Sequence, residues 1–190
     1  MLEQDAGPVH AAQLEALMRR VEADAAVGGW DQRPVLYRIS GTLDDPWLRR
    51  VPVPGAVGTV ASVLGSLPVL VDRRGLGVAF VHEAWTLKLG QERMRQLHAS
   101  FQAQGIAEAD MASAFKAWAD DFQRRTPVSS LPPELRVEQR LVHAALRDGT
   151  FLTLTRDRDD EPEMLPPNTL RGPVQQQLAR LAGADVKADG

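Results

Sequence analysis

A short stretch centred on Asp148-Gly149 constrains the fold more than any other part of this sequence. Two apolar-rich runs flank the dipeptide, LRVEQRLVHAALR before it and TFLTLTRD after it. Both residues of an Asp-Gly pair tolerate the positive φ angles that a two-residue type I′ turn requires. The pattern therefore predicts a β-hairpin whose two strands are Leu135–Arg147 and Thr150–Asp157.

The predicted two-residue turn also fixes which side chains face each other across the hairpin. It pairs Ala145 with Leu152 on one face and Leu146 with Phe151 on the other. Both faces then carry apolar side chains. A hairpin of this kind is expected to be covered on both sides, by helices or by another subunit.

Apolar spacing and turn residues place the remaining elements. Apolar side chains repeating every three to four residues predict helices over Pro8–Ala26, Gly55–Leu67, the two halves of Gly90–Arg125 and Asn168–Gly183. Strand-like composition predicts two further strands, Val35–Ile39 and Leu76–Leu87. Turn residues predict connections, in which proline restricts any strand to a sheet edge, over Gly41–Pro54, Thr126–Pro133 and Asp157–Pro167.

Together these elements predict an α+β fold built on an antiparallel sheet of about four strands. We expect the N-terminal and C-terminal helices to pack on one face of the sheet. The helical pair is expected near an edge or on the other face. Residues 1–183 then form a single α+β domain, with residues 90–125 as an added helical hairpin and residues 184–190 as a flexible tail.

Composition excludes several classes of protein. The chain of 190 residues has no cysteine, which excludes disulfides, thiolate metal sites and cysteine nucleophiles. Its formal net charge of -3 argues against a dominant nucleic-acid role. No apolar run approaches the length of a membrane span, and the acidic start MLEQDAG is unlike a secretory signal. We therefore expect a soluble, cytoplasmic protein.

The sequence carries no clear catalytic or cofactor motif. Thr86 stands four residues after His82, where a zinc-binding HExxH helix needs its second histidine. The acidic run over residues 157–163 has Pro162 where a calcium loop requires glycine. Phosphate-loop, dinucleotide and nucleophile-elbow motifs are also missing. We assign no cofactor, no metal and no catalytic residue, and an enzyme is the less favoured class.

One group of residues nevertheless qualifies as a candidate binding site. In a small-ligand or metal-dependent enzyme it would converge at the end of the sheet, and it consists of Trp30, Asp31, His82, Glu83 and Trp85. On a strand, His82 and Glu83 point to opposite faces and cannot share one ion directly. The alternative is structural, with Trp30 filling the corner between the first helix and the first strand.

The histidines allow two interpretations of their own. His82, His98 and His143 fall on three different elements that are expected to contribute to the core. One interpretation brings them together as metal ligands. The other, which we favour, makes them buried histidines that form ordinary hydrogen bonds.

The leading hypothesis for function is a non-catalytic module that binds a protein partner or associates with itself. It depends on an apolar ridge on the predicted helix after Gly105, spaced i, i+4, i+7, i+11 and made of Met111, Phe115, Trp118 and Phe122. The hairpin with two apolar faces supports the same hypothesis. No membrane partner is expected.

Nucleic-acid binding is a third hypothesis, although the acidic composition makes it less favourable. It requires basic side chains to gather on one face of the molecule, because phosphate neutralisation supplies most of the affinity. The arginines that would have to meet are Arg33, Arg38, Arg49, Arg50, Arg73 and Arg74.

Three short segments resemble a group of uncharacterised actinobacterial proteins that also occur in phages of those bacteria. The first segment, Gly29–Tyr37 (GWDQRPVLY), is similar to a GWDxPPxLF signature, with Arg33 in place of a proline. The others are Val78–Trp85 (VAFVHEAW) and Leu146–Thr150 (LRDGT). The resemblance implies an N-terminal helix, a small sheet and a C-terminal helix. It implies no activity, and a phage-encoded protein that interacts with the host is a further alternative.

Overall fold

The computed structural model describes residues 8–53, 59–71, 75–87, 91–126, 130–158, 160–168 and 172–184. Several predicted segments lie partly or wholly outside these residues: the tail over 185–190, residues 55–58 and 169–171 of two predicted helices, Gly90 of the predicted helical hairpin, and part of the connection after Thr126. The chain divides into two compact units. One contains Met1–Ala84 and Arg140–Gly190, and the other contains Trp85–Gln139.

The predicted α+β class is confirmed, with a sheet of six strands instead of four. Their order across the sheet is β2-β1-β3-β4-β5-β6. All four predicted strands form, as β1 (Val35–Gly41), β3 (Gly75–Leu87), β4 (Arg136–Leu146) and β5 (Phe151–Asp157). The two additional strands are short edge strands that lie in segments predicted to be connections, β2 (Pro46–Val51) and β6 (Glu163–Met164).

The predicted hairpin exists, but its turn is of a different type. The Gly149 N–H donates to the Leu146 carbonyl oxygen at 3.1 Å, and the Leu146 N–H donates to the Thr150 carbonyl oxygen at 2.9 Å. Gly149 has φ of 91°, whereas Asp148 is not among the described residues with positive φ. This is a three-residue loop that ends in a left-handed glycine. Its Asp148 carboxylate accepts from the Thr150 N–H at 2.9 Å.

The extra loop residue shifts the predicted register by one position. A shift of one residue moves each side chain to the other face of a strand. Leu146 and Leu152 both lie in the core beneath the first helix, while Ala145 and Phe151 both belong to the core on the opposite face. The predicted pairing of Ala145 with Leu152 and of Leu146 with Phe151 is therefore wrong.

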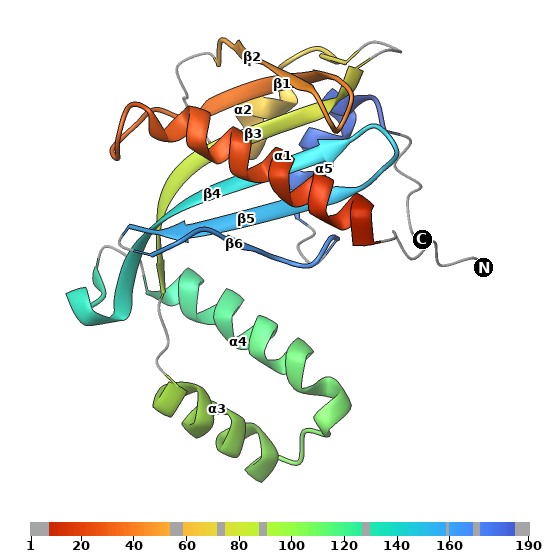
Figure 1. Ribbon diagram of the computed structural model, residues 1–190. Helices are drawn as coiled ribbons and strands as arrows, with labels where there is room; N and C mark the ends of the chain where they lie inside the picture. Colours follow the sequence, from red (N-terminus) through yellow and green to blue (C-terminus); the bar gives the residue numbers. More distant parts are fainter. Residues whose placement is uncertain are drawn as a thin grey trace. The chain divides into compact units, whose positions relative to one another are not determined.

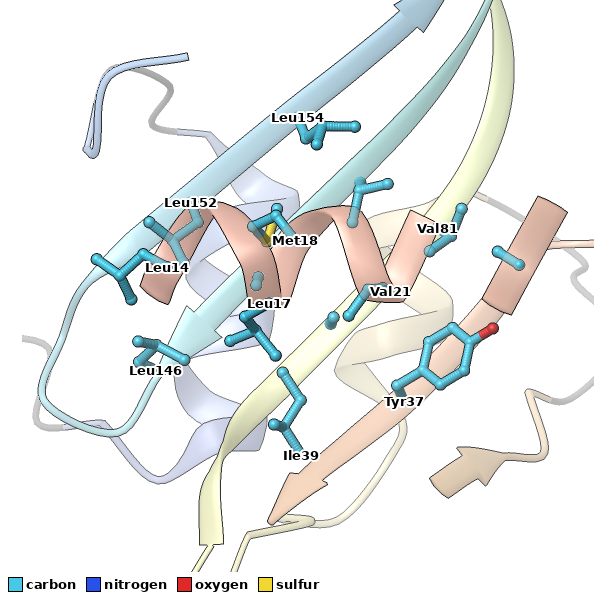
Figure 2. Close-up of a cluster of buried hydrophobic side chains, with 14 residues drawn as sticks. Leu14, Leu17, Met18, Val21, Tyr37, Ile39, Val81, Leu146, Leu152 and Leu154 are labelled. Carbon is cyan, nitrogen blue, oxygen red and sulfur yellow. The ribbon is translucent and has the colours of Figure 1, made fainter. Parts of the chain in front are cut away.

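Helix α1 (Pro8–Ala26) ends where it was predicted to end and covers one face of the sheet. Its buried side chains recur at helical spacing, and they pack on side chains from β1, β3, β4 and β5 (Figure 2). The helix residues in this core are Leu14, Leu17, Met18, Val21 and Ala25. After the helix, the Gly29 N–H donates to the Ala26 carbonyl oxygen at 2.8 Å, and Gly29 has φ of 80°.

The other face is covered by α2 (Val60–Gly65) and α5 (Pro173–Ala182). Figure 1 shows α1 in front of the sheet and these two helices behind it. The prediction that the N-terminal and C-terminal helices share one face is therefore wrong. Helix α5 instead pairs with α2, where Arg180 donates to the Leu64 carbonyl oxygen at 2.8 Å.

The second unit contains the predicted helical hairpin, formed by α3 (Gln91–Ala103) and α4 (Met111–Arg125). The helices contact each other through Phe101 and Phe115, whose rings meet edge to face with centroids 5.1 Å apart. Gly105 adopts φ of 80° between them. Among the described residues, no helix has the length and apolarity that are needed to cross a membrane.

Gly77 on β3 is the glycine whose substitution we expect to damage the sheet most. A β-carbon at this position would overlap the Ala145 carbonyl oxygen on β4 and lie 2.9 Å from the Leu146 α-carbon. Gly77→Ala is therefore expected to destabilise the protein by about 1–3 kcal/mol, the usual range for overpacking. Urea unfolding measures the difference, with Gly65→Ala as control because its new methyl group has room. Equal stability of the two variants would contradict the expectation.

Candidate functional site

A buried arginine lies at the centre of the most organised polar site in the first unit. The Arg140 side chain, on β4, is only 2% exposed. Its Nη1 donates to Glu22 Oε1 at 3.0 Å, and its Nη2 donates to Glu83 Oε1 at 2.7 Å. Nη2 also donates to the Gly29 carbonyl oxygen. One guanidinium therefore joins α1, the segment that follows it and two central strands.

Two further groups donate hydrogen bonds to the same two carboxylates. Arg156 on β5 donates to Glu22 Oε1 at 3.1 Å. The Gln32 backbone N–H donates to Glu83 Oε2 at 3.0 Å. Two guanidinium groups thus balance two carboxylates whose side chains are 5% and 9% exposed. Buried charges are tolerated when they are paired and hydrogen-bonded in this way.

Trp30 stacks against this network at the corner between α1 and β1. The Arg140 guanidinium lies 4.6 Å from the centre of the indole ring, and that of Arg158 lies 5.6 Å from it. Arg158 is also 3.6 Å from the carboxylate of Asp31. Asp31 has φ of 66°, which is uncommon outside glycine. The cation–π contacts and the ion pair together hold a strained segment against the sheet.

The structure brings together three of the five residues predicted for a binding site. Trp30, Asp31 and Glu83 all belong to the Arg140 network. His82 belongs to a different cluster and contacts Phe80, a member of the core on the face away from α1. Trp85 belongs to the second unit, is 51% exposed, and has the Arg136 guanidinium 5.1 Å from its ring centre.

Sequence reasoning missed the arginines and Glu22. A signal was present, because Glu22 follows Met18 by four residues and precedes Ala25 by three, on the apolar stripe of the helix. A charge at a core position of a helix implies a buried partner. The identity of that partner had no local signal, since Arg140 is 118 residues away in the chain.

His82 and His143 form a second cluster on the opposite side of the sheet. Their ring centroids are 5.5 Å apart. His143 Nδ1 is 3.2 Å from the Thr153 hydroxyl and 3.4 Å from Gln175 Nε2. Burial lowers the pKa of His143 from 6.5 to about 4, with a smaller contribution from His82, and burial also lowers the pKa of His82. Both imidazoles are therefore neutral at pH 7.

The less favoured alternative, in which three histidines meet as metal ligands, gains no geometric support. His98 belongs to the second unit, where its Nε2 lies 3.5 Å from the Glu108 carboxylate. Among the described residues, no three side chains of His, Cys, Asp or Glu are grouped so that they could hold a metal ion.

Of the arginines that the nucleic-acid hypothesis requires on one face, Arg49 and Arg50 lie on opposite faces of the sheet. Arg50 lies on the α1 side, where its Nη2 contacts Asp24 Oδ2 at 3.0 Å. The Tyr37 hydroxyl donates to the same oxygen at 2.7 Å. Burial and this hydrogen bond raise the pKa of Tyr37 to about 12, and the hydrogen bond lowers the pKa of Asp24. Arg73 and Arg74 lie outside the described residues.

The chemistry of the Arg140 network favours a structural clamp. Glu83 accepts hydrogen bonds at both carboxylate oxygens, and Glu22 accepts two arginines at one oxygen. A general acid or base must instead be able to exchange a proton with a substrate.

Comparison of the sequence with protein-family models, curated proteins and solved structures finds no match.

Proposed function

We propose that the protein is a non-catalytic interaction module that associates with a second copy of itself through the α3–α4 hairpin. The observation that carries the proposal is the small core of this hairpin. Among the described side chains of the two helices, only Phe101 and Met111 are buried. Phe115, Trp118 and Phe122 are half-buried.

The half-buried aromatic side chains form a continuous strip on α4. Trp118 and Phe122 stack on each other, with ring centroids 5.2 Å apart and an angle of 21° between their planes. Phe115 precedes Trp118 by three residues, so all three project from one side of the helix. Phe115 meets Phe101 of α3 at the seam between the two helices, yet all three rings of the strip stay half-buried. A strip that is only partly covered needs a further apolar layer.

A second copy of the chain supplies that layer with matching chemistry. Antiparallel helical hairpins pack in pairs as four-helix bundles, in which the core is formed by facing apolar strips. In a twofold dimer the same surface is used by both subunits. The strip of Phe115, Trp118 and Phe122 would then pack against its own equivalent, and aromatic side chains are favoured at such interfaces.

The first unit supports a non-catalytic assignment. Its buried carboxylates are committed to arginines and to a backbone N–H, as the contacts of Glu22 and Glu83 show. These bonds fix α1 and the segment after it on the sheet. The first unit therefore acts as a rigid support, and the second unit presents the interaction surface.

Trp118→Ala is expected to weaken the dimer strongly. A central tryptophan of an interface contributes about 2 kcal/mol or more, which corresponds to an increase of about thirtyfold in the dimer dissociation constant. Size-exclusion chromatography with light scattering over a dilution series measures this constant. Trp47→Ala is the matched control, because Trp47 belongs to the first unit and is 70% exposed.

Three outcomes would overturn the proposal. The first is a wild-type protein that is a monomer at every concentration tested. The second is an equal increase in the dimer dissociation constant for Trp118→Ala and for Trp47→Ala. If the strip instead packs within its own chain, Trp118→Ala will lower the unfolding temperature without changing the molecular mass. That outcome also counts against self-association.

A further inference from the structure

Two histidines lie side by side on the face of the sheet that α5 covers. His82 on β3 and His143 on β4 have ring centroids 5.5 Å apart. Each lies two residues along its strand from a member of the core beneath α5, Phe80 and Ala145 respectively. Side chains alternate along a strand, so both imidazoles point to that same face. His143 is 6% exposed, and His82 is half-buried.

The first turn of α5 contacts this pair through His143. The Nδ1 atom of His143 lies 3.4 Å from Nε2 of Gln175, the third residue of the helix, and 3.2 Å from the Thr153 hydroxyl. An amide nitrogen only donates, so its contact requires an Nδ1 atom without a proton. The N-terminal end of a helix also carries the positive end of its dipole. Both features favour the neutral form of His143.

The described surroundings of the pair also favour two neutral rings. Burial is the main cause that lowers the pKa of both imidazoles, and His82 lowers the pKa of His143 further. A backbone hydrogen bond with Glu83 partly opposes this lowering at His82. Helices α5 and α2 contain no acidic residue. The charged side chains that the described strands and helices direct to this face are Asp157, Glu163, Arg38, Arg49 and Arg180.

Both acids on this face lie towards the β6 edge of the sheet. Glu163 is on β6 itself, opposite Thr155 of β5. Asp157 is four residues along β5 from Thr153, a distance of about 13 Å. Protonated rings therefore have no adjacent carboxylate partner on the described strands and helices of this face.

We propose that the His82–His143 pair is an acid-sensitive switch that releases α5 from the sheet while α1 stays packed on the opposite face. Protonation of both rings places two like charges 5.5 Å apart. It also places a cation next to the positive end of α5, and it replaces the lone pair that faces Gln175 with an N–H group. All three effects are relieved when α5 moves away and water reaches the rings.

Helix α5 can separate without opening the sheet. It contributes Leu178, Leu181 and Ala182 to the core on its own face, and α2 and the strands supply the other members. The strands stay joined on the opposite face by α1 and by Arg140, which binds carboxylates of α1 and β3. An element with a small share of the core opens locally, at a lower free energy than unfolding of the whole protein.

Native-state hydrogen exchange of the full-length protein in low concentrations of urea tests the switch. Opening of α5, read from the amides of Leu178 and Leu181, is expected to increase about a hundredfold between pH 7 and about pH 4. The reason is that His143 titrates at about 4 while packed and near 6.5 once released. The urea dependence of this opening should be well below that of Leu17 and Val21 on α1, because release of one helix exposes less surface than unfolding does.

Two variants assign the acid response to the pair. In His143→Gln, opening of α5 is expected to change less than about threefold over the same pH range, because glutamine does not titrate. His82→Gln removes one of the two like charges and should show a weaker response than the wild type. His10→Gln, on α1, is the matched control and should respond to acid as the wild type does. Circular dichroism verifies that each variant is folded.

The switch is overturned if α5 and α1 open with the same constant and the same urea dependence, because the helix then leaves only when the sheet unfolds. An α5 opening that does not change with pH in the wild type also overturns it. So does a His143→Gln variant that keeps the full acid response. If His143→Gln does not fold, a His82→Gln variant with the full response decides against the switch.

Discussion

Arg140→Ala is expected to destabilise the protein by about 3–5 kcal/mol, the usual effect of removing one partner of a buried ion pair. Among the described residues, the substitution leaves the Gln32 backbone N–H as the donor to the Glu83 carboxylate and Arg156 as the donor to Glu22. Both glutamates then remain in a buried site without the guanidinium that paired with them. Urea unfolding at pH 7 measures the change. For a protein of this size the unfolding temperature should fall by about 10 °C.

Arg19→Ala is the control for this prediction. Arg19 pairs with Glu15 on the exposed side of α1, and both side chains are 46% exposed. Its loss is expected to cost less than about 0.5 kcal/mol, because exposed ion pairs contribute little. Equal destabilisation by Arg19→Ala and Arg140→Ala would show that the buried network does not stabilise the fold.

A double variant tests whether the cost comes from unpaired charge. Arg140→Met keeps much of the apolar stem, and Glu83→Gln removes one buried charge. Combined, they are expected to be more stable than Arg140→Met alone, since buried ion pairs can be replaced by neutral groups at little cost. A double variant that is the less stable of the two would contradict this account.

The secondary structure was predicted well wherever one segment carries its own pattern. Helix α1 follows its apolar stripe and ends before the Gly28-Gly29 pair, as the sequence indicates. The hairpin was predicted from its two apolar strands, but its register was not. An Asp-Gly pair suits both two-residue and three-residue loops, and only Gly149 uses the positive φ. Because the loop has one residue more than predicted, every cross-strand residue pair of the hairpin shifts by one position.

The arrangement of helices depends on contacts that no local pattern encodes. Helix α5 packs opposite α1 because its Leu178 and Leu181 share a core with Leu64 of α2, more than a hundred residues away. An amphipathic helix indicates that one of its sides is buried. It does not indicate which face of the sheet receives it, and the predicted placement was wrong for this reason.

The candidate site was predicted only in part, because it also depends on contacts between segments that are distant in the sequence. The sequence indicates three of its members, the large apolar ring of Trp30 and two acids near strand ends, Asp31 and Glu83. Arg140 lies in a run of strand residues, where a single charge is easily taken as solvent-facing. Its role emerges only when three distant segments meet around one guanidinium.

The second large effect is a loss of stability in acid that depends on His143. Its pKa is lowered by burial from 6.5 to about 4. The unfolded chain therefore binds a proton at a higher pH than the folded protein does. Stability is fully present above about pH 6.5 and falls as the pH decreases towards 4. The full effect of the shift is about 3 kcal/mol.

His143→Gln isolates this contribution, because glutamine keeps a hydrogen-bonding group but does not titrate. Urea unfolding of wild type and variant between pH 7.5 and about pH 4 measures the difference as a function of pH. Asp24, whose pKa is lowered by its hydrogen bond to Tyr37, adds an acid-dependent term common to both proteins. The wild type should lose stability faster than the variant as the pH falls. Parallel curves, or a His143 imidazole that titrates near 6.5 by NMR, would contradict a buried neutral imidazole.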